Sequence, residues 1–315
     1  MATDRPTLAQ SRTSLAVSFL LMGTVVTIRV VGESGAHHLR ESIDRAIALM
    51  RMVEQELSRF DEESGLRTLC RHAGQTVLVS PVLFHALKVA VEMADLTDGV
   101  FDPTIAPRLL QLGFNRHYLT QNPVVADIAV DPTASFRDII LIDEGCQVRL
   151  DKPMLLDLGA VGKGLAIDLA ARELHNHEGF AIDAGGDVYV AGVDPEGGLW
   201  HVGIENPHDP ARLLDQLTLS NAAVCTSGRY RRPSSVDVSQ HHLINARSGL
   251  SAQGLMSCTV VGPQALMADV VATAAFLLGP QQALRFIEQL GLAGLCVADD
   301  LKIERTTTME AFRRE

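Results

Sequence analysis

Two oxygen-bearing side chains interrupt an apolar stretch, MADVVATAAF, in the last sixth of the chain. Asp269 and Thr273 are four residues apart, so on a helix they would share one face, one turn apart. A carboxylate and a hydroxyl suit a hard cation such as Mg²⁺, which takes oxygen ligands and leaves positions for water and phosphate. The same pair also fits a structural role, with Asp269 near a helix start and Thr273 bonded to the preceding turn. Spacing alone leaves both roles open.

The densest polar cluster is LDLGAVGKGLAID, in which Gly159, Gly162 and Gly164 stand between an expected strand and an expected helix. Such a junction is suited to anions. A P-loop is excluded because glycine follows Lys163, and the GxxGxG spacing differs from the GxGxxG of dinucleotide sites. Asp157 and Lys163 would both point at whatever occupies the turn, with Lys163 supplying a positive charge to a phosphate. The glycines by themselves are equally consistent with close helix packing.

A third cluster, HHLINARSG, contains the adjacent His241 and His242. Neighbouring residues of a strand face opposite ways, so at most one of them addresses a given site and the other is packed or solvated. Histidine is the natural general base for an alcohol at neutral pH. The fourth cluster, TDGVFDPTIAP, places Asp102 before a proline, which by itself is ordinary turn chemistry.

The charge balance and the cysteines of the chain limit the classes of partner and of site that we expect. The chain has 315 residues, with 27 Lys and Arg against 38 Asp and Glu and a formal net charge of -11. That field repels phosphate backbones, so we expect no nucleic-acid partner. The five cysteines are scattered without a CxxC pair, which excludes a disulfide framework and a zinc site.

The N-terminal region does not predict a membrane segment. Its longest purely apolar run, FLLM, is far shorter than the roughly 20 residues that a spanning helix requires. Neither a small-residue cleavage site nor a lipid-accepting cysteine follows it. We expect a cytoplasmic protein without membrane insertion.

The elements that must position these clusters alternate irregularly between strands and helices. Helices are predicted over 38–60, over 81–96 after a Ser80 cap, from the glycine cluster to about 174, and over 266–278 and 281–290. Strands are predicted over 17–31, 139–142, 147–150, 154–158, 180–182, 187–193, 200–204, 217–219, 222–225, 256–261, 294–298 and 302–305. This order favours an α+β fold with mixed or antiparallel sheets and packed helices.

The predicted helices and strands also suggest where the domain begins and ends. Residues 1–21 are interpreted as an N-terminal extension and residues 22–315 as one domain. The stretch 118–136 has two prolines and few periodic apolar positions. It is therefore the one plausible seam within the domain.

Seven motifs, read in order, resemble the FAD:protein FMN transferase family (ApbE-like flavin transferases). They are MGT (22–24), DGVFDPTIAP (98–107), LDLGAVGKGLAID (156–168), DAGGDVYVAG (183–192), TSGRY (226–230), HHLINARSG (241–249) and ADVVAT (268–273). The resemblance covers about residues 22–291 and implies a T-fold-related flavin transferase architecture. It implies an enzyme that takes FAD as substrate and uses Mg²⁺, with Mn²⁺ as the alternative. FMN would be joined by a phosphoester to a Thr or Ser hydroxyl of a target flavoprotein, with release of AMP.

The resemblance also implies residue roles. The positions that match FAD contacts are Met22, Phe60, Val100, Phe101, Asp102, Asp157, Lys163 and Ile244. The positions that match metal ligands are the carbonyl of Ala160 and the side chains of Asp269 and Thr273. His242 matches the base that deprotonates the acceptor hydroxyl, and Asp269 is a second catalytic candidate as ligand and orienter.

Two alternatives use the same residues. In an FAD pyrophosphatase, water would replace the acceptor hydroxyl at the metal site and the products would be FMN and AMP. In a flavin-binding protein without catalysis, a hypothesis motivated by Asn245 in the turn after His242, FAD would stay intact. The sequence does not separate transferase from pyrophosphatase.

Overall fold

The computed structural model describes residues 12–33, 35–121, 123–124, 128–209, 211–230, 234–237 and 239–313. Its largest sheet has eight strands in the order β1-β2-β6-β7-β10-β13-β14-β15, and all of their pairings are antiparallel. The strands are β1 (Thr13–Leu21), β2 (Thr24–Gly32), β6 (Gly179–Ala184), β7 (Asp187–Gly192), β10 (Ala222–Gly228), β13 (Leu255–Gly262), β14 (Ala293–Ala298) and β15 (Ile303–Arg305). The predicted α+β class with antiparallel sheets is confirmed.

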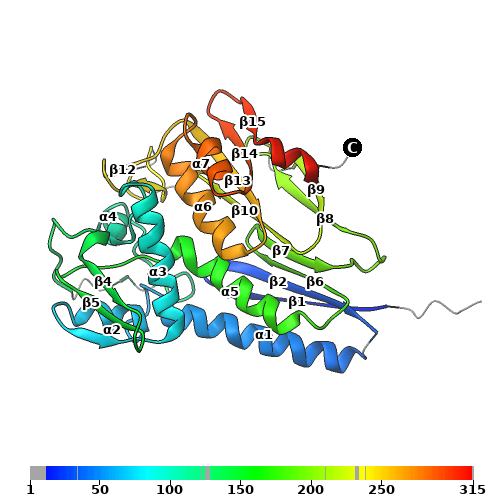
Figure 1. The fold of residues 1–315 in the computed structure, drawn as a ribbon, viewed down its shortest axis with the longest axis horizontal. Helices are drawn as coiled ribbons and strands as arrows, with labels where there is room; N and C mark the ends of the chain where they lie inside the picture. The colour runs from blue at the N-terminus through cyan, green and yellow to red at the C-terminus, as the bar shows by residue number, and fades with distance from the viewer. Residues whose placement is uncertain are drawn as a thin grey trace, which may run out of the picture.

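Helices cover one face of this sheet (Figure 1). α1 (Ala36–Leu57), α5 (Gly159–Leu174) and α6 (Ala265–Leu278) lie side by side on it, and α7 (Ala283–Gln289) packs on β14. α1 buries residues at intervals of three and four, as an amphipathic helix does. α6 is buried nearly all round because it lies between the sheet and α5. A charged side chain on α6 therefore needs a partner.

The opposite face of the sheet is covered by the hairpin of β8 (Trp200–Glu205) and β9 (Leu213–Leu219). At the end of the molecule near the C-terminus of α1 lies a third group of elements, which contains a small three-stranded sheet. Its members are α2 (Gly65–Arg71), β3 (Thr76–Leu78), α3 (Pro81–Leu96), α4 (Ala106–Gln111), β4 (Ile139–Ile142) and β5 (Gln147–Leu150). A two-stranded hairpin, β11 (Ile244–Asn245) and β12 (Leu250–Ser251), lies beside α6. The predicted cap of α3 is confirmed: the backbone N–H of Leu83 donates to Ser80 Oγ at 3.2 Å.

Three expectations were wrong. The strand expected over 17–31 is a hairpin, whose turn holds Met22 (φ 51°) and Gly23 (φ 74°) in the left-handed region. Residues 13–21, expected to be part of an extension, form the edge strand β1, while residues 1–11 lie outside the described residues. No strand forms over 154–158, and α5 begins at Gly159, so the glycine cluster lies inside the first two turns of the helix.

The sequence also missed α2, β3 and α4, which are short elements held by their neighbours. Among the described helices, none has both the length and the apolarity that a membrane crossing requires.

Candidate active site around Lys163, Asp187 and Asp269

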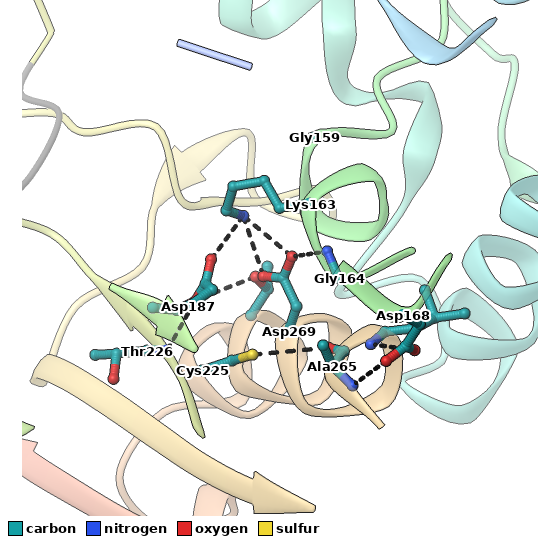
Figure 2. Close-up of polar contacts among 12 residues, drawn as sticks. Gly159, Lys163, Gly164, Asp168, Asp187, Cys225, Thr226, Ala265 and Asp269 are labelled. Carbon is teal, nitrogen blue, oxygen red and sulfur yellow. Dashed lines mark hydrogen bonds and ion pairs between the residues drawn. The ribbon is translucent and has the colours of Figure 1, made fainter. Parts of the chain in front are cut away.

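Two buried carboxylates share one ammonium group where α5, α6 and β7 meet (Figure 2). Lys163 Nζ lies 3.1 Å from Asp187 Oδ2, and 3.2 Å and 3.1 Å from the two carboxylate oxygens of Asp269. The side chains of Asp187 and Asp269 are 5% and 4% exposed, and that of Lys163 is 22% exposed. The site thus carries one more potential negative charge than positive charge in a largely water-free place.

Asp269 is held by the backbone of the facing helix. The N–H of Gly164 donates to Asp269 Oδ2 at 3.1 Å. This contact requires glycine, because a Cβ on Gly164 would lie 2.5 Å from the carbonyl oxygen of Ala265. Gly164 therefore has the close-packing role that the sequence left open for the glycines, because it lets α5 approach the start of α6. Burial raises the pKa of Asp269 to about 7, against the opposing pull of Lys163.

Thr273 lies one turn further along α6, as the spacing predicts. Its Oγ1 is 2.9 Å from the hydroxyl of Ser227 on β10. Ala160 lies in the first turn of α5, four residues before Gly164, whose N–H donates to Asp269. Within the described ranges no group of three or more His, Cys, Asp or Glu residues could hold a metal. A cation here would instead use one carboxylate, a hydroxyl and a carbonyl, which are oxygen ligands that Mg²⁺ accepts.

The contacts that the structure describes for Asp157 and Lys163 are to different partners, although the sequence suggested that both would address one turn. Asp157 pairs with Nε of Arg59 and accepts the N–H of Gly159 at 2.9 Å. The Arg59 guanidinium is 4.0 Å from the centre of the Phe60 ring and donates to the carbonyl of Phe114 at 2.7 Å. Two predicted FAD contacts, Asp157 and Phe60, are therefore joined by a buried arginine that the sequence analysis did not single out.

Met22 lies near the same aromatic side chains. Its N–H donates to Glu54 Oε1 at 2.7 Å, and the Tyr118 hydroxyl donates to the same oxygen at 3.0 Å. Burial and the nearby Glu54 carboxylate raise the pKa of Tyr118 to about 12. The ring of His117 stacks on Tyr118 at 4.8 Å and meets the edge of Phe60 at 6.3 Å. These contacts bring the hairpin turn, α1 and the 114–121 loop together.

Val100 and Phe101 are buried and, together with the partly buried Asp102, form the turn before α4. Asp102 caps the short 3-10 helix Pro103–Ile105, since its Oδ1 accepts the N–H of Thr104 at 2.8 Å, and its Oδ2 accepts the N–H of Phe136 at 3.1 Å. Burial raises the pKa of this carboxyl, although the hydrogen bonds oppose the shift. The turn borders a cavity of about 770 Å³ whose walls include three arginines: Arg108, Arg137 and Arg247.

The two adjacent histidines have different surroundings. His241 is 5% exposed, its Nε2 donates to the carbonyl of Ala252 at 2.9 Å, and its Nδ1 accepts the N–H of Leu243 at 3.3 Å. Burial lowers the pKa of His241. His242 is half-buried and meets the edge of the Phe114 ring at 6.2 Å. His241 is thus the packed member of the pair, and Ile244 lies in a small apolar cluster with Leu109 and Leu112.

Three residues that complete the site were not predicted from the sequence. Asp187 lies in the DAGGD motif and Ser227 in TSGRY, so the motifs were seen but the partners were not. No sequence pattern singled out Arg59, which directly precedes Phe60 at the end of the helix predicted over 38–60. All three meet their partners only through contacts between elements far apart in the chain.

Comparisons with known proteins concern the family and the fold of the chain. Residues 22–296 match the sequence model described as "ApbE family". A protein of Treponema pallidum (strain Nichols) named FAD:protein FMN transferase is 27% identical over 310 residues, which span 90% of this chain and 84% of that protein. The crystal structure of the ApbE protein from Thermotoga maritima superposes with a TM-score of 0.81 at 26% identity, covering 96% of this chain and 100% of that one.

A second solved structure, the flavin transferase ApbE from Vibrio cholerae, has a TM-score of 0.80 at 23% identity and covers 96% and 99% of the two chains. At that identity the likeness concerns the fold. The sequence match spans nearly nine-tenths of the chain and includes all seven motifs. This chain belongs to the ApbE family.

Proposed function

We propose that this chain is an FAD:protein FMN transferase, which moves FMN from FAD to a Thr or Ser hydroxyl of a target flavoprotein. The observation that carries the proposal is the buried Asp269 with the Lys163 ammonium held against it, one helical turn from the Thr273 hydroxyl. The names of the matched relatives support the substrate and the reaction class.

The residues present fit a divalent cation. Asp269, Thr273 and the Ala160 carbonyl offer oxygen ligands, and the Lys163 ammonium shows that a positive charge is accommodated beside Asp269. When bound, Mg²⁺ (or Mn²⁺) would neutralise the charge of the FAD pyrophosphate and of the departing AMP. This neutralisation matters because the chain carries a formal net charge of -11.

The FAD would be held by the two groups of residues around Arg59 and Glu54. Phe60 and Met22 offer apolar contacts, Asp157 offers an acceptor, and the Val100–Asp102 turn and Ile244 complete the proposed set of FAD contacts. Lys163 would contact the pyrophosphate. Such positioning, together with charge neutralisation, is the main source of rate in phosphoryl transfer.

His242 is the proposed base. It would take the proton from the acceptor hydroxyl as the oxygen forms a bond to the phosphorus of the FMN half, while the bond from that phosphorus to the AMP oxygen breaks. The products are the flavinyl phosphoester and AMP. Of the two histidines, His242 is the less buried, and both ring nitrogens of His241 take part in hydrogen bonds to the backbone.

The proposal includes a cytoplasmic location and a cytoplasmic acceptor. The five cysteines are free thiols in the structure, which is usual in reducing compartments.

The test is to incubate the purified protein with FAD, Mg²⁺ and an extract of its host, then look for flavin fluorescence on a denaturing gel while measuring AMP. We expect a fluorescent band with the wild type and with Asp143→Asn, a control at a 79% exposed aspartate. We expect none with Asp269→Ala. AMP without a band would favour the pyrophosphatase, and FAD left intact would favour a flavin-binding protein.

A further inference from the structure

The Lys163 ammonium has two carboxylate partners that differ in what holds them. Asp269 projects from α6 and is fixed by the Gly164 N–H. Asp187 opens β7, and its Oδ1 accepts the N–H of Thr226 on the neighbouring strand β10 at 3.1 Å. Each carboxylate therefore has one oxygen bonded to backbone, and Lys163 Nζ reaches both residues (Figure 2).

The movable member of this triad is the lysine. Its ammonium is carried on a flexible four-carbon stem, whereas both carboxylates sit on short side chains anchored to packed elements. Asp269 is also the residue that we assign to the divalent cation. A cation on Asp269 and the ammonium of Lys163 would repel each other within the same few ångströms, so one of them must give way.

We propose that Asp187 is a positioning residue that keeps the Lys163 ammonium in the site when a divalent cation takes Asp269. In the metal-free protein Lys163 pairs with both carboxylates. With the cation on Asp269, Lys163 retains Asp187 as its partner, and its other N–H groups are directed to the phosphates. This inference rests on the proposed function for its phosphate ligand, but its test on metal binding is independent of FAD.

The alternative is that Asp187 acts on the metal directly, as a ligand or through its charge. The two accounts differ in what Lys163 contributes. If Asp187 acts through Lys163, removing Asp187 matters only while Lys163 is present. If Asp187 acts directly, its removal weakens metal binding in either background.

A double-mutant cycle separates the two accounts. Mn²⁺ alone, without FAD, is titrated into wild type, Asp187→Asn, Lys163→Met and the double variant, and free Mn²⁺ is followed by electron paramagnetic resonance. Asparagine keeps the acceptor for the Thr226 N–H, and methionine keeps the length of the lysine stem. Fluorescence of Trp200, the single tryptophan, and far-UV circular dichroism check that each variant is folded.

We expect Asp187→Asn to weaken Mn²⁺ binding about tenfold, the size usual for residues that orient metal sites indirectly. Without Asp187 the ammonium loses the carboxylate that would hold it beside the metal, and the metal must compete with it for Asp269. We expect Lys163→Met to tighten binding, and Asp187→Asn to have less than a twofold effect in that background. An equal loss in both backgrounds, no loss in either, or no Mn²⁺ binding by the wild type would overturn the inference.

The two proposals fail in different ways. If the four proteins show this pattern with Mn²⁺ but the wild type leaves FAD unchanged, the inference on Asp187 holds and the transferase proposal is refuted. If the wild type transfers FMN but the effects of the two substitutions on Mn²⁺ binding are additive, the transferase proposal holds and the inference on Asp187 is refuted.

Discussion

At the scale of single residues, Arg59 is the least expected member of the site. Its side chain is 7% exposed and connects Asp157, the Phe114 carbonyl and the face of Phe60. Its Nη1 is buried without a hydrogen-bond partner among the described residues. The arginine therefore depends on Asp157, and Asp157 depends on the arginine, because a buried charge is costly once its partner is removed.

We expect Arg59→Met to lower the free energy of unfolding by about 3 kcal/mol, the cost of leaving the partly buried Asp157 carboxylate without its charge partner. FAD binding should weaken as well, because Asp157 and Phe60 lose the group that aligns them. Urea unfolding and a fluorescence titration with FAD measure the two effects. The matched control is Arg40→Met, which breaks the exposed pair with Asp44 and should cost less than about 1 kcal/mol. Equal costs for the two variants would show that Arg59 is not an anchor.

His241 gives a pH-dependent prediction. Burial lowers its pKa in the folded state, whereas an unfolded histidine titrates near ~6.5. Below that pH the unfolded chain binds a proton that the folded chain does not, so the stability falls as the pH falls. In His241→Gln, whose amide can still donate to the Ala252 carbonyl, the unfolding free energy should fall less between pH ~7.5 and ~5.5.

The chain has 11 histidines, so only the difference between the wild-type and variant profiles isolates His241. Parallel profiles would mean that this histidine titrates alike in the folded and unfolded chains.

What the sequence could predict at this scale was local. Asp269 and Thr273 were paired by helical spacing, and the structure places them on one face of α6. Asp187 and Arg59 could not be paired from spacing, because Asp187 meets Lys163 only when β7 packs beside α5, and Arg59 meets Asp157 from 98 residues away. Long-range contacts of this kind leave no periodic trace in the chain.

At the scale of elements, the long amphipathic helices and most strands were predicted within a few residues, because their apolar periodicity is strong. The exception at 154–158 has a physical reason. Four of these five residues are apolar and buried, but the N–H of Asp157 donates to the Pro103 carbonyl at 2.8 Å and not to a neighbouring strand. An apolar run shows burial and does not by itself show pairing.

The glycines of α5 supply the element-scale prediction. A Cβ on Gly164 would lie 2.5 Å from the Ala265 carbonyl oxygen and 2.6 Å from the Leu266 Cα, so the two helices would have to separate. We expect Gly164→Ala to destabilise the protein by about 1–3 kcal/mol. It should also weaken Mn²⁺ binding, because the N–H bond to Asp269 is lost with the helix contact.

Gly162→Ala is the matched control two residues away. Its Cβ would meet only Leu57 Cδ1 at 3.6 Å, an ordinary contact. Alanine also favours helix over glycine by up to about 1 kcal/mol. Stability and Mn²⁺ affinity should therefore be kept or improved, and a loss as large as that of Gly164→Ala would contradict close helix packing as the cause.

At the scale of the whole molecule, the eight-stranded sheet separates two apolar clusters. The larger lies under α1, α5 and α6 and draws residues from both sides of the 118–136 stretch, such as Phe101 and Ile139. The smaller lies under the β8–β9 hairpin and includes Trp200. Adjacent residues of one strand serve different clusters: Val224 faces the smaller and Cys225 the larger. Displacing β10 would therefore expose both clusters to water at once.

The predicted single domain should therefore unfold in one step. Trp200, the single tryptophan, is 8% exposed and donates to the Ala191 carbonyl at 2.9 Å, so its fluorescence follows the smaller cluster. Far-UV circular dichroism follows mainly the helices over the larger one. In urea the two signals should change at the same midpoint. Val224→Ala and Cys225→Ala, adjacent changes on opposite faces of β10, should each shift both midpoints together. A variant that moved only the tryptophan signal would show that the β8–β9 side unfolds independently, because the strands shared by the two clusters would then not be enough to couple them.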